Sequence, residues 1–331
     1  MNSDKPLKDT FDRQIEYLRI SITDKCNLRC VYCAPSGRPR YFREADVLTD
    51  AEIVRFVRIA RRHGLKKVRI TGGEPLMRKN VTGLIRSIKE TGIQDLSITT
   101  NGIKLSHIAA ELKDAGLDRV NISLDTLDAD RYRSITSGGD IDLVWRSIKE
   151  AERVGLSPVK INVVPIHGIN DDEIPAFASL TFENDFHVRF IEFMPATCNG
   201  MWKKDKCVSA ADILKKISGL GDLEQYEFRG NGPSRNYRIK GARGVIGVIS
   251  PISDHFCRSC NRLRLTADGK IRPCLFSKEK IDIRSPMRNS ASDEEIDALF
   301  CGAVKIKPRG HEINENISSR SIIKTMSKIG G

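Results

Sequence analysis

The sequence predicts an α/β protein, in which an incomplete parallel (βα)6 barrel is followed by a smaller C-terminal domain. From about residue 16 to 193, short β-rich runs alternate with longer amphipathic segments. This order produces parallel strands that are joined by right-handed crossovers. After about residue 195 the alternation fades, and from about residue 224 short strand-like runs alternate with glycine-rich turns. We therefore predict one domain over 10–230 and a second over 231–331.

The individual elements follow from the hydrophobic pattern. Asp50 is expected to open the first helix and Gly64 to close it. A short helix over Asp212–Ile217 and strand-like runs such as Gly241–Ile249 are expected in the C-terminal part. The six predicted strands of the barrel are Tyr17–Ile22, Lys67–Thr71, Asp95–Thr99, Arg119–Leu124, Val159–Pro165 and His187–Phe193. The helices predicted between them include Asp50–His63, Val81–Thr91, Leu105–Ala115 and Leu143–Val154.

Polar motifs follow four consecutive predicted strands. In folds of this class, chemistry is located at the carboxyl ends of the strands, in the loops that lead into the helices. The motifs occupy residues 26–33, 72–75, 100–102 and 123–125, after the first, second, third and fourth strand. The sequence therefore predicts one site that is built from several loops.

Composition and charge restrict the class of protein. The 331 residues carry a formal net charge of +12, which indicates an acidic partner, either nucleic acid or a polyphosphate substrate. Nucleic acid is not expected, because the basic residues are scattered without a long Lys/Arg block and with few interleaved aromatic residues. The sequence has no run of about 18 apolar residues, and its N-terminus has no apolar stretch typical of a secretory signal. No membrane contact and a cytoplasmic location are therefore expected.

Six of the nine cysteines form two triplets, and Cys26, Cys30 and Cys33 make up the first. The C-x3-C-x2-C spacing places three thiolates within eight residues, enough to hold one face of a [4Fe–4S] cluster. Such a cluster normally takes four cysteines, so one iron would stay open to another ligand. Zinc is the alternative, but no histidine lies within the segment. Cys198, Cys207 and Cys301 share no spacing and are interpreted as ordinary thiols.

The second triplet, Cys257, Cys260 and Cys274, has C-x2-C-x13-C spacing. It is interpreted as a second cluster with one open iron, which could bind a nitrogen or oxygen atom of a substrate base. The alternative is a zinc knuckle with His255 as the fourth ligand.

Two arginines, Arg262 and Arg264, lie between the cysteines of the second triplet. They alternate on a strand-like run, so both side chains project from the same face. The planar guanidinium group is suited to phosphate recognition, although a solvated strand face would also carry arginines.

The first triplet resembles the signature of the radical S-adenosylmethionine superfamily, which has an aromatic residue, here Tyr32, before its last cysteine. Gly72-Gly73-Glu74-Pro75 resembles the GGEP motif of that superfamily. The resemblance implies that the open iron binds the amino and carboxylate groups of S-adenosylmethionine. One electron from the cluster then cleaves the sulfonium bond and yields a 5′-deoxyadenosyl radical.

Nearly the whole chain resembles the GTP 3′,8-cyclases of molybdenum-cofactor biosynthesis, the molybdopterin A family. The resemblance rests on LRISITDKCNLRCVYC, VRITGGEPLMRKN, CNRLRLTADGKIRPCLF and the terminal Gly330-Gly331. It implies a lyase that converts GTP into 3′,8-cyclo-7,8-dihydro-GTP, with two [4Fe–4S] clusters and S-adenosylmethionine as cofactors. A homodimer, an electron-donor protein and the next enzyme of the pathway are the implied protein partners. One departure is Ala34, where the family usually has methionine.

The resemblance also implies a role for individual residues. Arg262 and Arg264 would contact GTP, and arginine could supply a proton or stabilise developing charge. The glycine tail, Gly330 and Gly331, would assist radical initiation. The remaining implied residues are Cys26, Cys30 and Cys33 for the first cluster, Cys257, Cys260 and Cys274 for the second, Tyr32, Gly73, Ser123 and Met194 for S-adenosylmethionine, and Arg19, Arg69, Thr100 and Lys160 for GTP.

Two rival interpretations remain. The first is a radical enzyme with an auxiliary cluster that acts on a peptide or a tRNA, although the Arg-Leu-Arg run and the Gly-Gly tail argue against it. The second is a zinc-holding module that binds nucleic acid, which would be colourless and would lose RNA affinity steeply with salt.

Overall fold

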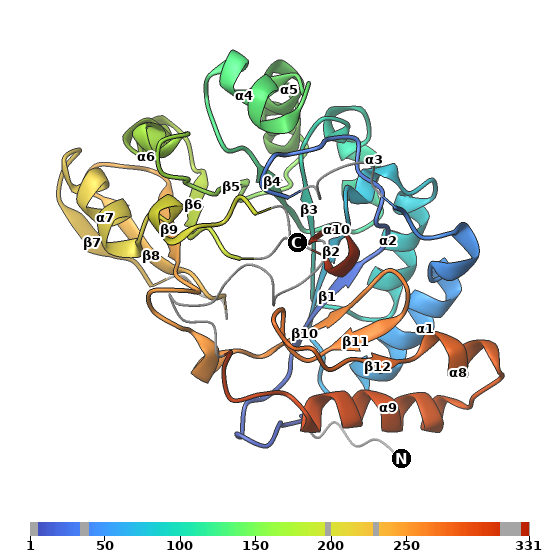
Figure 1. Ribbon diagram of the computed structural model, residues 1–331. Helices are drawn as coiled ribbons and strands as arrows, with labels where there is room; N and C mark the ends of the chain where they lie inside the picture. Colours follow the sequence, from blue (N-terminus) through green and yellow to red (C-terminus); the bar gives the residue numbers. More distant parts are fainter. Residues whose placement is uncertain (1–5, 34–39, 196–199, 228–231, 312–325, 331) are drawn as a thin grey trace.

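A computed structural model describes residues 6–33, 40–195, 200–227, 232–311 and 326–330 of the chain. In these residues every strand belongs to one sheet, which Figure 1 shows as an arc with helices along its outer side. The strands are β1 (Tyr17–Ser21), β2 (Lys67–Thr71), β3 (Asp95–Thr100), β4 (Arg119–Ser123), β5 (Lys160–Val163), β6 (His187–Ile191), β7 (Leu223–Gln225), β8 (Arg235–Ile239), β9 (Val245–Ile249), β10 (Arg262–Leu265), β11 (Lys270–Arg272) and β12 (Ile281–Asp282).

The six predicted strands form the parallel centre of this sheet. Strands β1 to β6 pair in sequence order, each parallel to the next, which confirms the predicted α/β core. Strand β10 then pairs parallel with β1, and β9 pairs parallel with β6. The strand order runs from β12 at one end to β7 at the other, and these two end strands are not paired within the described residues. The sheet is thus an open arc that strands from both predicted domains share, and the division at residue 230 stays a prediction.

The helices cover the outer side of the arc, except for the last one. The short α10 lies inside the arc, next to β1 (Figure 1). The α-helices are α1 (Asp50–Arg61), α2 (Val81–Glu90), α3 (Ala109–Asp114), α4 (Ala129–Thr136), α5 (Ile141–Arg153), α6 (Ile174–Glu183), α7 (Ala210–Ser218), α8 (Arg284–Arg288), α9 (Asp293–Lys305) and α10 (Met326–Ile329). The 3-10 helices are η1 (Glu44–Asp46), η2 (Pro75–Met77), η3 (Leu105–His107), η4 (Asp171–Glu173), η5 (Lys204–Lys206) and η6 (Cys257–Ser259).

Two helix boundaries differ from the prediction. Thr49, not Asp50, caps α1, because its side chain accepts from the Glu52 N–H while Glu52 accepts from the Thr49 N–H. Gly64 follows the helix with a left-handed backbone (φ +81°), as predicted. The predicted helix over 105–115 is divided into η3 and α3 at Ile108, whose backbone (φ −131°, ψ 6°) is not helical.

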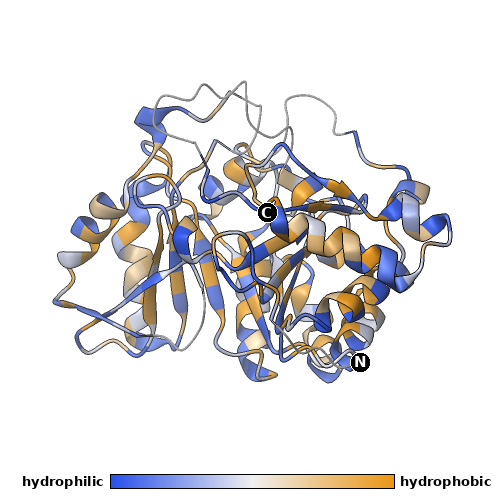
Figure 2. Ribbon diagram, turned by 90° about the horizontal axis from the view of Figure 1, so that it is seen from below, coloured by the Kyte–Doolittle hydropathy of each residue, from blue (hydrophilic) through white to orange (hydrophobic). Residues whose placement is uncertain are grey.

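The core lies between the sheet and the outer helices. Side chains of alternate strand residues, such as Leu18, Ile20, Val68 and Ile70, are fully buried there. Hydrophobic residues are concentrated on the strands and on the helix faces (Figure 2). Each fully buried side chain of this kind stabilises the fold by about 1.5–3 kcal/mol. Among the described residues, no helix combines the length and the apolar character that a membrane span requires.

Candidate active site

The inner face of the arc is polar, whereas the outer face is apolar. Along a strand, successive side chains point to opposite faces. On β1, Leu18 and Ile20 pack towards the helices, while Tyr17 and Arg19 line a cavity inside the arc. The same alternation on the neighbouring strands brings Lys67, Arg69, Thr99, Arg119, Ser123, Lys160, Asn162, Arg189, Arg262 and Arg264 to the cavity.

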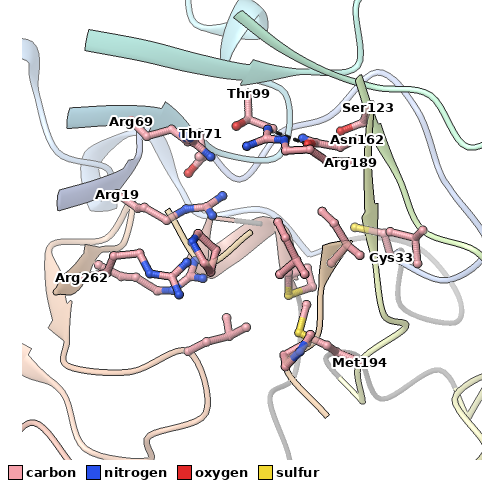
Figure 3. Close-up of a pocket in the computed structure, with 18 of the residues that line it drawn as sticks. Arg19, Cys33, Arg69, Thr71, Thr99, Ser123, Asn162, Arg189, Met194 and Arg262 are labelled. Carbon is pink, nitrogen blue, oxygen red and sulfur yellow. Dashed lines mark hydrogen bonds between the residues drawn. The ribbon is translucent and has the colours of Figure 1, made fainter. Parts of the chain in front are cut away.

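The cavity has a volume of about 460 Å³ and is lined by both cysteine triplets. This volume suits a small-molecule ligand. Figure 3 shows Arg19, Arg69 and Arg262 on one side of the cavity and Cys33 and Met194 on the other. These three arginines thus lie apart from Cys33 of the first triplet within one site.

A row of arginines crosses three adjacent strands. Arg264 of β10 is the register partner of Arg19 on β1, and Arg19 is the register partner of Arg69 on β2. Burial, followed by the charge of Arg264, holds the pKa of Arg19 well below its usual range. Burial, followed by the charge of Arg262, lowers the pKa of Arg264 to about 10. These shifts show that the cations repel one another, so a bound polyanion would relieve the repulsion.

Two more cations line the cavity from β5 and β6. Burial, followed by the charge of Arg189, lowers the pKa of Lys160 to about 6. Burial, followed by the charge of Arg69, lowers the pKa of Arg189 to about 9. The Arg189 guanidinium donates to Asn121 Oδ1 (2.5 Å) and Asn162 Oδ1 (2.6 Å), which fix its position. Its Nε and the Thr99 hydroxyl have no hydrogen-bond partner among the described residues.

Lys67 and Arg119 also line the cavity, but a carboxylate balances their charge. Asp95 of β3 forms ion pairs with both side chains, and Lys67 Nζ lies 2.8 Å from Asp95 Oδ2. The Asp95 carboxylate therefore already neutralises part of the charge that Lys67 and Arg119 bring to the cavity.

The first triplet occupies the loop after β1. Hydrogen bonds from Arg29 N to Thr136 O (3.1 Å) and from Val31 N to Ile135 O (2.9 Å) fasten this loop to the end of α4. Burial, followed by the charge of Cys26, raises the pKa of Cys33 to about 12. Three half-buried thiolates in one loop need a cationic group among them, and the irons of a cluster would meet this need.

The spacing of the sulfurs favours clusters over zinc. Two thiolates on one tetrahedral zinc would lie about 3.8 Å apart, given zinc–sulfur bonds of about 2.3 Å. In the described residues, His63, Asp297 and Cys301 are the one His/Cys/Asp/Glu trio whose ligand atoms all lie within 4.8 Å of one another. All six cysteines of the two triplets are among the described residues, but in neither triplet do the three sulfurs all lie within 4.8 Å of one another. The wider spread suits ligands that bind different irons of one cluster.

The loop after β2 packs directly on the first triplet's loop. Gly73 N donates to Thr23 O (2.7 Å), and Glu74 N donates to Lys25 O (2.8 Å). A Cβ atom at Gly73 would collide with the Lys25 carbonyl, so only glycine allows this approach.

Glu74 joins the loops after β2 and β3. Its carboxylate is 1% exposed and accepts from the Thr100 hydroxyl (2.8 Å), the Asn101 N–H (2.8 Å) and the Leu76 N–H (3.0 Å). Thr100, which was predicted to contact GTP, lines the cavity, and its hydroxyl donates to Glu74 and accepts from the Gly102 N–H.

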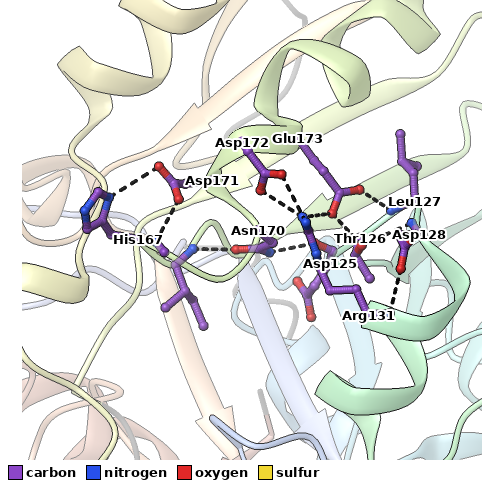
Figure 4. A network of polar contacts seen from close by, with 12 residues as sticks. Asp125, Thr126, Leu127, Asp128, Arg131, His167, Asn170, Asp171, Asp172 and Glu173 are labelled. Carbon is purple, nitrogen blue, oxygen red and sulfur yellow. Dashed lines mark hydrogen bonds and ion pairs between the residues drawn. The ribbon is translucent and has the colours of Figure 1, made fainter.

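Tyr32 connects the first triplet to the loop after β4. Its hydroxyl donates to Asp125 Oδ2 (2.5 Å), and Asp125 Oδ1 accepts from Val164 N (2.8 Å). Figure 4 shows the polar network that holds this loop, in which Asn170 Nδ2 donates to Asp125 O (2.6 Å). Glu173 accepts from Leu127 N (2.6 Å) in the same network. The network keeps Asp125 beside the first triplet.

The second triplet lies at the other side of the cavity. Cys257 belongs to η6, Cys260 precedes β10, and Cys274 follows β11. Burial raises the pKa of Cys260, but the charges of Arg262 and Lys307 outweigh burial and lower this pKa to about 6. His255, the alternative zinc ligand, directs Nδ1 to Pro251 O (2.7 Å).

The C-terminal tail reaches the same cavity. The Arg264 guanidinium donates a short hydrogen bond to the carbonyl oxygen of Gly330. Gly330 is buried, and Met326 and Ser327 of the preceding helix α10 line the cavity. The tail is therefore part of the wall of the site, while Gly331 lies outside the described residues.

The predicted residues converge on this site. Tyr32, Gly73, Ser123 and Met194 all line the cavity, as do the six triplet cysteines. Cys207 lies elsewhere and donates to Phe193 O (3.2 Å), and Cys301 lies on α9 near His63. Ala34 and Cys198 fall outside the described residues.

Some lining residues were not predicted. Lys67, Arg119, Asn162 and Arg189 occupy the same alternate phase of their strands as the predicted residues. The alternation of side chains along each of the six strands could have identified these residues, because every second residue faces the cavity.

Comparison with protein families matches two models to consecutive parts of the chain. Residues 20–181 match the Radical SAM superfamily, and residues 186–313 match the family Molybdenum Cofactor Synthesis C. The chain is 48% identical to the GTP 3′,8-cyclase of Alkaliphilus metalliredigens over 98% of its own length and 100% of that protein. It is also 48% identical to the GTP 3′,8-cyclase of Moorella thermoacetica, with the same coverage of both chains.

Solved structures share the fold at low sequence identity. Streptococcus suis SuiB bound to S-adenosylmethionine matches 81% of this chain and 63% of its own, with 19% identity and a TM-score of 0.56. Native anSMEcpe with bound AdoMet matches 89% of this chain and 82% of its own, with 14% identity and a TM-score of 0.58.

Proposed function

This chain belongs to the GTP 3′,8-cyclase family of radical S-adenosylmethionine enzymes, and from that premise we propose how its cavity converts GTP. The product is 3′,8-cyclo-7,8-dihydroguanosine 5′-triphosphate, and the reaction is the first step of molybdenum-cofactor biosynthesis. The cofactors are two [4Fe–4S] clusters and S-adenosylmethionine. The observation that carries the proposal is that a single cavity is lined by both cysteine triplets and by a row of arginines.

Each triplet is proposed to hold one cluster. Cys26, Cys30 and Cys33 would bind the first, and Cys257, Cys260 and Cys274 the second. When bound, the first cluster and S-adenosylmethionine would supply a 5′-deoxyadenosyl radical that takes a hydrogen atom from C3′ of the GTP ribose. Bonding of C3′ to C8 of guanine would leave a ring radical, and one electron from the electron donor and one proton would convert it into the 7,8-dihydro product. Three cysteines would leave one iron of the second cluster without a protein ligand, and the guanine would take that position.

The cations are proposed to hold the triphosphate. Arg264, Arg19 and Arg69 lie side by side on adjacent strands, and Lys160 and Arg189 line the cavity from β5 and β6. Several cations around one cavity attract a triphosphate with up to four negative charges. Holding the base and the triphosphate at opposite ends would place the ribose between them and exclude water from the reacting carbons.

The remaining side chains position the cofactor and the tail. Tyr32, Ser123 and Met194 would line the S-adenosylmethionine site together with the backbone of Gly73. Thr100 would act through Glu74, since its hydroxyl donates to that carboxylate. The hydrogen bond between Arg264 and Gly330 would hold the tail at the arginine row, where Gly330 and Gly331 assist radical initiation.

A cytoplasmic location, a homodimer, an electron-donor protein and hand-over to the next pathway enzyme are further proposals that rest on the family alone. A radical enzyme that acts on a peptide or a tRNA is the second candidate, and no contact in the cavity favours it.

The test is anaerobic incubation of the reconstituted, reduced protein with S-adenosylmethionine, with and without GTP. We expect 5′-deoxyadenosine above the GTP-free control, together with a cyclised nucleotide triphosphate. A level of 5′-deoxyadenosine that GTP does not raise, but that added tRNA or peptide does raise, would contradict the proposal.

A further inference from the structure

A buried lysine lies directly behind the second triplet. Lys307 follows α9 and is 3% exposed. A buried ammonium needs hydrogen-bond acceptors on every side, because burial removes its hydration. The partners of this side chain therefore indicate what it does.

All the acceptors of Lys307 belong to the segments that carry the second triplet. Its Nζ donates to Arg262 O (2.8 Å) and Pro273 O (2.9 Å), and it also donates to Cys260 Sγ (3.6 Å). Pro273 directly precedes Cys274. Three donated hydrogen bonds require the charged form of the amine, because a neutral amine has two N–H groups. One ammonium thus links the Cys260 segment to the Cys274 segment.

A neighbouring cation differs from Lys307 in how its charge is balanced. The Arg13 guanidinium donates to Cys257 O (2.7 Å) and Pro308 O (2.6 Å), and its Nε lies 2.6 Å from Asp9 Oδ2. Arg13 therefore supports Cys257, the remaining cysteine of the second triplet, while the Asp9 carboxylate neutralises the charge of Arg13. Lys307 has no ion pair with a carboxylate within the described residues, so its charge acts mainly on the Cys260 thiolate.

We propose that Lys307 is a positioning residue for the second cluster, which orients Cys260 and Cys274 and raises the cluster's reduction potential by donating to the Cys260 thiolate. The inference rests on the proposed assignment of the second triplet to a cluster. A hydrogen bond and a positive charge at a ligand sulfur stabilise the reduced, more negative cluster over the oxidised one. The same contacts hold two ligand segments together and slow the loss of iron.

The experiment uses the full chain with the first triplet removed, Cys26→Ala/Cys30→Ala/Cys33→Ala, so that every iron belongs to the second site. Into this parent we introduce Lys307→Met, which removes the charge and the donors, or Lys307→Gln, which keeps two donors without the charge. Lys305→Met is the matched control, because Lys305 is an exposed lysine at the end of α9, two residues before Lys307. The readouts are iron per chain, iron release to a chelator, and the midpoint potential from redox titration followed by electron paramagnetic resonance.

We expect about four irons per chain in the parent and in the control. Lys307→Met should lower the midpoint potential so that the ratio of reduced to oxidised cluster falls about tenfold, which for a one-electron couple is about 59 mV. It should also release iron to the chelator about 10-fold faster. Lys307→Gln should give a midpoint potential between those of the parent and of Lys307→Met. If Lys307→Met does not fold, the potential of Lys307→Gln tests the inference.

Equal potentials in both Lys307 variants and in the Lys305→Met control would overturn the inference, even if the variants were less stable to heat. A parent without iron would overturn the assignment of the second triplet itself, and the inference with it.

Discussion

Replacement of Lys160 should change how GTP affinity depends on pH. Burial and the charge of Arg189 lower the pKa of Lys160 to about 6 in the cavity without ligand. At pH 7.5 only about 3% of Lys160 is then charged, so protonation costs about 2 kcal/mol before the triphosphate can use the charge. A bound triphosphate raises this pKa, because an opposite charge favours the charged form.

The sign of the effect follows from this linkage. Because GTP raises the pKa of Lys160, binding takes up a proton, and affinity falls as pH rises through 6 towards the pKa of the complex. Between pH 6.5 and 8.0 the contribution of Lys160 should weaken GTP binding about 20-fold. In Lys160→Met this contribution disappears, and the remaining pH dependence belongs to GTP and to the other groups of the cavity.

The assay is isothermal titration calorimetry of GTP into the reconstituted protein at pH 6.5, 7.25 and 8.0, without S-adenosylmethionine so that no turnover occurs. Buffers with different ionisation enthalpies give the number of protons taken up per GTP. Lys149→Met, a replacement of an exposed lysine on α5, serves as the control. Equal pH slopes and equal proton uptake in the native chain and in Lys160→Met would refute the reasoning.

Two further variants test other parts of the site. Arg189→Met removes a cavity charge and the hydrogen bonds to Asn121 and Asn162. Because hydrogen bonds to charged groups contribute about 1.5–3 kcal/mol, GTP binding measured by calorimetry should weaken about 10- to 100-fold. Unchanged affinity would exclude Arg189 from the triphosphate site. Gly330→Ala should lower turnover about 100-fold with little change in GTP affinity, because a Cβ atom at this position would collide with the Thr71 hydroxyl. Gly219→Ala, at an exposed glycine, is the control. Full activity of Gly330→Ala would show that the tail has no part in the reaction.

The sequence was sufficient for the order and position of the central strands, because each carries an alternating pattern between clear turn signals. Strand β2, Lys67–Thr71, agrees with its predicted range at both ends. The helix α9 was not predicted, although Ser292 and Glu295 form a capping box that marks its start.

The site could be predicted only as far as local spacing and resemblance reach. Cysteine spacing predicted two cluster-binding triplets, but the partners of Thr100 and Lys307 depend on contacts between segments far apart in the chain. The pairing of β10 with β1 likewise could not be derived from local pattern, and this pairing brings Arg264 beside Arg19. Long-range register therefore determines which cations act together.

The most direct test of the central claim uses GTP with deuterium at the ribose C3′ position. If the cavity holds GTP between the two triplets with C3′ towards the S-adenosylmethionine side, each molecule of 5′-deoxyadenosine formed should contain one deuterium atom and be one mass unit heavier. Unlabelled 5′-deoxyadenosine formed together with a product that keeps its C3′ deuterium would contradict the proposed placement of GTP.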